Sequence, residues 1–127
     1  MIQSTKELYN KMLETPGICG KFELIDNTIF WNLFDGYEIQ ISIDPPDTYF
    51  GIAKKLFGKI TDSIIHWHPN EEDVFQEVCA IGLKGHVLVI RKNLLCSSVV
   101  YMGKEGNSPY SIKKKLSWGK IYYLKAK

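Results

Sequence analysis

Cysteine is scarce in this chain, and its three copies lie far apart in the sequence. Cys19, Cys79 and Cys96 are odd in number and form no C-x-x-C pair. A disulfide framework needs an even set of cysteines, and a zinc ribbon needs closely spaced pairs, so the pattern excludes both. It favours a reduced, cytoplasmic setting.

Long apolar runs and sequence motifs of catalysis are missing as well. The longest apolar runs, such as His86 to Ile90, are the size of a strand, whereas a bilayer span needs ~18 apolar residues. The first 15 residues are charged and amphipathic, which predicts no signal peptide. The chain has no internal repeat and no G-x-G-x-x-G, Walker, G-x-S-x-G or H-E-x-x-H motif. We therefore expect no membrane partner, no cofactor and no catalytic residue.

What is present is the composition of an ordinary globular domain. The 127 residues are 45% hydrophobic and 24% charged, which predicts one domain over residues 1–127. The formal net charge is only +2, but it is unevenly spread. Residues 1–103 carry nine basic and thirteen acidic side chains, and residues 104–127 carry seven basic and one acidic. An acidic body with a basic end favours a charged surface partner.

Capping signals and helical spacing predict about three helices. Ser4 and Glu7 form a capping box for a helix from Thr5 to Glu14. Asp47, after two prolines, is a good N-cap for a second helix. Asn70 is placed to cap a third, from Glu71 to about Leu83. The apolar stripe of the expected second helix consists of Tyr49, Phe50, Ala53, Leu56, Phe57 and Ile60.

Alternating and continuous apolar runs predict the strands. In the run from Tyr37 to Ile43, odd positions are expected to face the core, while Glu38 and Gln40 face water. Asp26-Asn27 and Asp35-Gly36 are turn signals, and the second is typical of a type I′ hairpin. The expected strands are Lys21–Ile25, Thr28–Phe34, Tyr37–Ile43, Ser63–His68, His86–Arg91, Leu94–Met102 and Lys120–Lys125.

Together these elements predict an α+β fold, a mainly antiparallel sheet with helices packed on one face. The expected order is α-β-β-β-α-β-α-β-β-β. A loop from Gly103 to Ser108 and a short helix near Pro109 to Lys115 complete the interpretation.

Two histidines in the run from Ser63 to His68 are the candidate metal ligands. His66 and His68 are two residues apart on an expected strand, so they share a face, and Glu72 follows with a carboxylate. The spacing is similar to the first metal motif of cupins, but Ile60 and Cys79 stand where that motif has glycine. The alternative is that both histidines have structural or interface roles and that Glu72 belongs to the acidic first turn of a helix.

Cys96 is a second candidate for chemistry. With His86 or His66 it provides the residue types of a Cys–His nucleophile pair. No local pattern activates the thiol, so the sequence leaves the role of Cys96 open.

The basic end offers a candidate binding surface. Lys113, Lys114 and Lys115 lie near Trp118 and several tyrosines, and cations interleaved with aromatic rings are typical of nucleic-acid grooves. The alternative is that the lysines are solvated while the apolar neighbours pack inward. A basic patch of this kind also fits an acidic protein partner.

One resemblance bears on function. The segment from His66 to Pro69, the acidic run from Asn70 to Asp73 and the strand from Val87 to Ile90 resemble small bacterial α+β proteins grouped with immunity proteins of polymorphic toxin systems. The resemblance implies a non-enzymatic role, namely binding and blocking a cognate toxin. We therefore expect a non-catalytic protein-interaction module. One alternative is a metal- or ligand-binding domain or small hydrolase centred on His66 and His68. The other is a nucleic-acid binder that uses the basic C-terminal region.

Overall fold

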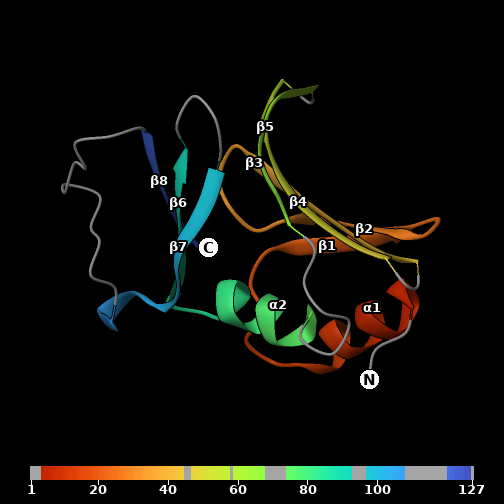
Figure 1. Ribbon diagram of the computed structural model, residues 1–127. Helices are drawn as coiled ribbons and strands as arrows, with labels where there is room; N and C mark the ends of the chain where they lie inside the picture. Colours follow the sequence, from red (N-terminus) through yellow and green to blue (C-terminus); the bar gives the residue numbers. More distant parts are fainter. Residues whose placement is uncertain are drawn as a thin grey trace.

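The computed structural model describes residues 4–44, 47–57, 59–67, 74–92, 97–107 and 120–126. Over these ranges the chain forms two α-helices, a short 3-10 helix and two antiparallel sheets (Figure 1). The helical elements are α1 (Thr5–Glu14), α2 (Val74–Gly82) and η1 (Glu105–Asn107). The strands are β1 (Lys21–Ile25), β2 (Thr28–Asn32), β3 (Tyr37–Asp44), β4 (Asp47–Leu56), β5 (Lys59–Trp67), β6 (His86–Lys92), β7 (Ser97–Lys104) and β8 (Lys120–Lys125).

The first sheet is a five-stranded meander in the order β1-β2-β3-β4-β5. Each strand pairs with the next along the chain. The β4–β5 pairing shifts register between Ile52 and Ala53 and again between Lys54 and Lys55. Irregularities of this kind bend a strand and increase its twist. In Figure 1, β4 and β5 curve away from the plane of β1 and β2.

The second sheet has the order β7-β6-β8, with β6 in the centre. Its side chains join the same hydrophobic cluster as the first sheet and the two helices. Tyr37 of β3 and Tyr122 of β8 meet edge to face, with ring centroids 6.4 Å apart. The largest fully buried side chains are Leu8, Met12, Ile29, Trp31, Leu33, Ile39, Ile41, Ile43, Phe50, Ile52 and Ile81.

The first helix agrees with the prediction at both ends. Ser4 is the N-cap, and its hydroxyl accepts a hydrogen bond from the Glu7 backbone N–H at 3.1 Å. Thr5, in the first turn, is fully buried, and its hydroxyl accepts from the Ile43 backbone N–H at 2.8 Å. The start of α1 is therefore tied to the end of β3.

The helix expected after Asp47 is wrong, because this stretch forms strand β4. Its apolar residues satisfy helical spacing, but Thr48, Phe50 and Ile52 also alternate, and all three side chains are buried. Gly51 lowers helix stability in the middle of the stretch. β4 pairs with β3 at eight positions, beginning with Asp44 and Asp47 on either side of a two-residue connection. The described residues thus contain two α-helices rather than about three.

The hairpin turns also differ in detail from the prediction. The turn predicted at Asp26-Asn27 is confirmed as a two-residue connection, and Asp26 there has a φ of 54°. At Asp35-Gly36 only the glycine has positive φ, so a type I′ turn, which needs both, is wrong there. The strand expected to end at Phe34 ends at Asn32. The strand expected from Ser63 begins earlier, at Lys59.

The remaining elements mostly agree with the prediction where the structure describes them. The strand expected over Lys120–Lys125 has those bounds, and β6 extends one residue beyond the expected Arg91. β7 reaches Lys104, so Gly103 is in a strand and not in a loop. The expected acidic first turn at Glu71 and the short helix near Pro109 to Lys115 lie outside the described residues. Within the described ranges, no helix is long and apolar enough to cross a membrane.

Candidate functional site

The end of the β4–β5 hairpin exposes three large apolar side chains, which we call the apolar tip. Leu56 and Ile60 are each 53% exposed, and Phe57 is 94% exposed. Single exposed apolar residues are ordinary on protein surfaces, but three at the end of one hairpin make that end a candidate contact site. The apolar tip is therefore the first candidate for partner binding.

The backbone at Phe57 is itself unusual. Its φ is 51°, in the left-handed region, where the β-carbon of a bulky side chain meets the backbone. Asp26 is the other described non-glycine residue with positive φ, and aspartate tolerates that region far better. A strained aromatic residue that gains no burial is a feature of recognition sites rather than of folding.

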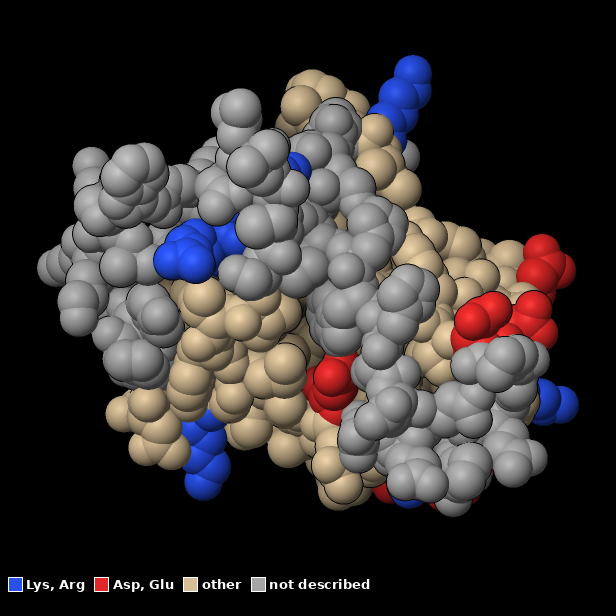
Figure 2. All heavy atoms as spheres, viewed as in Figure 1, with Lys and Arg blue, Asp and Glu red and all other residues tan. Residues whose placement is uncertain are grey.

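Charged side chains are exposed at both ends of the first sheet. Lys54 and Lys59 are exposed beside the apolar tip, whereas Asp26 is exposed in the β1–β2 turn and Glu23 is exposed in the middle of β1, two residues from the exposed Lys21. Figure 2 shows a basic side chain projecting near the end of the β4–β5 hairpin and acidic side chains over β1 and β2. A partner with acidic groups around an apolar pocket would complement the apolar tip.

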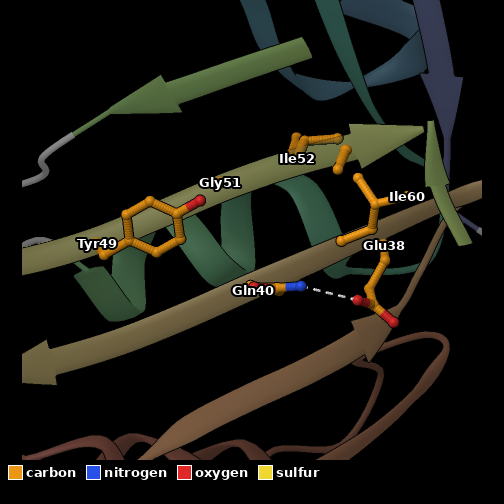
Figure 3. A pocket seen from close by; sticks show the side chains of 7 residues that line it. Glu38, Gln40, Tyr49, Gly51, Ile52 and Ile60 are labelled. Atoms are coloured by element: carbon orange, nitrogen blue, oxygen red, sulfur yellow. Dashed lines mark hydrogen bonds between the residues drawn. The ribbon is translucent and has the colours of Figure 1, made fainter. Parts of the chain in front are cut away.

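Next to the apolar tip is a hollow on the sheet face that points away from the helices. It measures about 200 Å³ and is shown in Figure 3. Because side chains alternate along strands, β3 and β4 turn their polar and small residues to this side. The lining residues are Glu38, Gln40, Tyr49, Gly51, Ile52, Ala53 and Ile60.

Glu38 carries the charge in the hollow. One carboxylate oxygen accepts from Lys55 Nζ at 2.8 Å, and the other accepts from Gln40 Nε2 at 2.9 Å. Burial acts to raise the pKa of Glu38, but the hydrogen bonds from Lys55 and Gln40, together with the charge of Lys55, outweigh it. The pKa of this carboxyl is therefore below its ordinary value of 4.5.

The expectation that Glu38 faces open water is wrong. Its exposed fraction is 6%, although its neighbours Gln40 and Ser42 on the same face are half-buried. The bend of β4 and β5 is the reason, since it brings Ile60 into the same hollow as Glu38 (Figure 3). The alternation along β3 correctly indicates the face on which Glu38 lies. It does not indicate that the bent β4–β5 hairpin covers this side chain.

The Glu38 carboxylate makes stability depend on pH. Because its pKa is lower when folded, its contribution is present above about pH 4.5 and is lost as pH falls through the folded pKa. We expect Glu38→Gln to lower the free energy of unfolding by about 1 kcal/mol at pH 7, a value reduced because Lys55 is one-third exposed. Urea unfolding of both proteins at pH 7, 5 and 3.5 should show this difference shrinking with acidity. A constant difference would contradict the ion-pair assignment.

The structure bears on one of the three candidate metal ligands. The backbone of His66 pairs with Gly51 in the β4–β5 ladder, whereas His68 and Glu72 lie outside the described residues. Within the described part of the chain, no group of three or more His, Cys, Asp or Glu side chains could hold a metal ion. The structure therefore leaves the metal site a prediction.

The other sequence candidates are not brought into one site. Lys113, Lys114, Lys115 and Trp118 lie outside the described ranges, as does Cys96. His86 is half-buried, and its Nδ1 is 2.8 Å from the Ala80 carbonyl oxygen, so that nitrogen is already occupied. Cys19 and Cys79 carry free thiols, and burial raises the pKa of Cys79.

Sequence reasoning missed the apolar tip because it placed Leu56, Phe57 and Ile60 on the buried side of a helix. Comparison with known protein families, curated proteins and solved structures finds no match to this chain. Its function must therefore be argued from its own residues.

Proposed function

We propose that this chain is a non-catalytic protein-interaction module that binds its partner through the apolar tip. The carrying observation is Phe57, which is 94% exposed on a left-handed backbone. Binding would remove the ring from water. Burial of one large apolar side chain favours the complex by on the order of 2 kcal/mol. Aromatic anchors of this kind dominate the energetics of protein interfaces.

The surroundings of Phe57 support a protein partner with acidic groups. Leu56 and Ile60 expose further apolar surface at the same hairpin end, one on each face, and Lys54 and Lys59 are exposed beside them. An apolar centre with a charged rim is the usual organisation of a protein interface. The rim charges would act mainly on association rate and on its salt dependence.

The proposal includes an immunity-type role, in which the bound partner is a toxin that the chain blocks. Its support is the resemblance of the histidine-containing segment and the strand from Val87 to Ile90 to immunity proteins. The proposal also includes a cytoplasmic location. The free thiols of Cys19 and Cys79 support it, because thiols persist in reducing compartments.

The Phe57→Asn variant should change partner binding and folding stability in opposite directions. Asparagine tolerates the left-handed backbone, so we expect the variant to be more stable than the wild type by about 1 kcal/mol. Loss of the ring should weaken partner binding at least tenfold. The measurement is crosslinking of the full chain in the organism that encodes it, followed by reconstitution of the purified pair and calorimetry.

Ile25→Thr is the matched control, because Ile25 is also an exposed apolar residue at a hairpin but lies on β1. It should bind the same partner with unchanged affinity. If Phe57→Asn binds as tightly as the wild type, the apolar tip is not the interface.

The immunity-type role is tested separately, by expressing the identified partner in cells with and without this chain. A toxin should stop growth when it is expressed alone and should not stop growth when this chain is co-expressed.

A further inference from the structure

The hollow beside the apolar tip differs from the tip in chemistry, because it contains a buried carboxylate. We propose that this hollow binds the guanidinium group of an arginine side chain. The inference is carried by Glu38, Gln40, Tyr49 and Gly51 and does not rest on the function proposed for the apolar tip. Ile60 is the one residue that the two sites share.

The size of the hollow limits what enters it. Sites for whole small-molecule ligands usually measure about 300–1,000 Å³, and this one measures about 200 Å³. A single long side chain fits such a space. Ala53 and Ile60 provide apolar walls suited to the methylene stem that arginine packs against protein surfaces.

The polar groups of the hollow favour a cationic donor. An ionised carboxylate offers about four acceptor positions, and Glu38 uses two of them, for Lys55 and Gln40. Gln40 turns its Nε2 donor toward Glu38, which leaves its carbonyl oxygen as a further acceptor. Guanidinium is a planar group with five donors and no acceptor, so it matches this set better than an ammonium does.

Gly51 and Tyr49 give the hollow its shape. A β-carbon at position 51 would lie 2.5 Å from the Tyr49 hydroxyl oxygen, so the ring occupies space that any other residue would fill. Figure 3 shows the Tyr49 ring lying along β4 with its hydroxyl toward Gly51. Guanidinium stacks on aromatic faces, and the half-buried Tyr49 ring offers one beside the Glu38 carboxylate.

Lys55 acts as an internal competitor for this site. Its side chain is 34% exposed, and its Nζ lies 2.8 Å from a Glu38 carboxylate oxygen. An arriving guanidinium must share Glu38 with it or displace it toward solvent. Removing the ammonium while keeping the apolar stem, as in Lys55→Met, should therefore improve binding.

The test is an NMR titration of the full-length chain with N-acetyl-arginine methylamide, with the lysine analogue as the comparison probe. We expect saturable shifts of the Gly51 and Ala53 amide signals, with millimolar affinity for the arginine probe and at least fivefold weaker binding of the lysine probe. Lys55→Met should tighten arginine binding at least fivefold. Glu38→Gln should weaken it at least tenfold.

Two outcomes would overturn the proposal. One is the absence of a saturable shift in both the wild type and Lys55→Met, a variant that keeps Glu38 and the apolar stem. The other is equal affinity of the arginine and lysine probes. Phe57→Asn should bind the arginine probe like the wild type, so loss of this site and loss of the apolar tip are distinguishable.

Discussion

Replacing Gly82 by alanine should destabilise the protein by about 3 kcal/mol, at the upper end of what overpacking a core costs. Gly82 is buried at the end of α2, where a β-carbon would lie 2.5 Å from Trp31 Cζ2 and closer still to Cη2. Trp31 is fully buried, and its indole Nε1 donates to the Cys19 carbonyl at 2.8 Å. The indole is therefore anchored by this hydrogen bond on one side and packed against Gly82 on the other.

A double-mutant cycle shows whether this contact is responsible. Phenylalanine at position 31 lacks the indole atoms that the new β-carbon would meet. Gly82→Ala should therefore cost about 1 kcal/mol in a Trp31→Phe background, against about 3 kcal/mol in the wild type. Urea unfolding of the four proteins measures both values. Gly106→Ala is the matched control, because a β-carbon there meets nothing within 4 Å, and equal costs in both backgrounds would refute the contact.

Thr5→Val should cost about 2 kcal/mol, because it removes a hydroxyl while keeping the shape of the side chain. The fully buried Thr5 hydroxyl accepts from the Ile43 N–H at 2.8 Å and is 3.4 Å from the Ile43 carbonyl oxygen. Valine leaves the Ile43 N–H without this acceptor. Burying an unpaired backbone donor costs more than the net worth of the hydrogen bond.

Thr5→Ser is the matched control for this hydrogen bond. Serine keeps the hydroxyl and loses one methyl group, which should cost about 1 kcal/mol. The valine variant should therefore be the less stable of the two, although it is the more apolar. Thermal unfolding should place the midpoint of Thr5→Val several degrees below that of Thr5→Ser. The reverse order would mean that burial of the methyl group, not the hydrogen bond, holds α1 to β3.

Elements with strong local signals could be predicted from the sequence. The Ser4 cap defines the start of α1, and the run beginning at His86 defines β6. β4 could not be predicted in this way. Its apolar residues fit helical and strand spacing alike, and its pairing with β3 at eight positions decides between them. That pairing is a property of two segments and is not visible in either one alone.

The candidate site was harder to predict than the fold for a related reason. No sequence pattern indicates that phenylalanine at position 57 takes positive φ, because that conformation follows from how the hairpin closes. The burial of Glu38 depends on the bend of β4 and β5, which brings Ile60 over the polar face of β3. Composition favours a surface partner but does not locate the surface.

The order of strands in the second sheet has a consequence for synthesis of the protein on the ribosome. Every pairing of the first sheet joins neighbours in the chain and is complete once β5 has emerged. β6, by contrast, pairs on one side with β8 (Lys120–Lys125), which follows it in the chain only after β7 and η1. Until β8 has been translated, the edge of β6 that pairs with β8 has no partner strand, although β6 contains the buried run from Val87 to Ile90. An open apolar strand edge invites aggregation, so the nascent chain is most vulnerable during this interval.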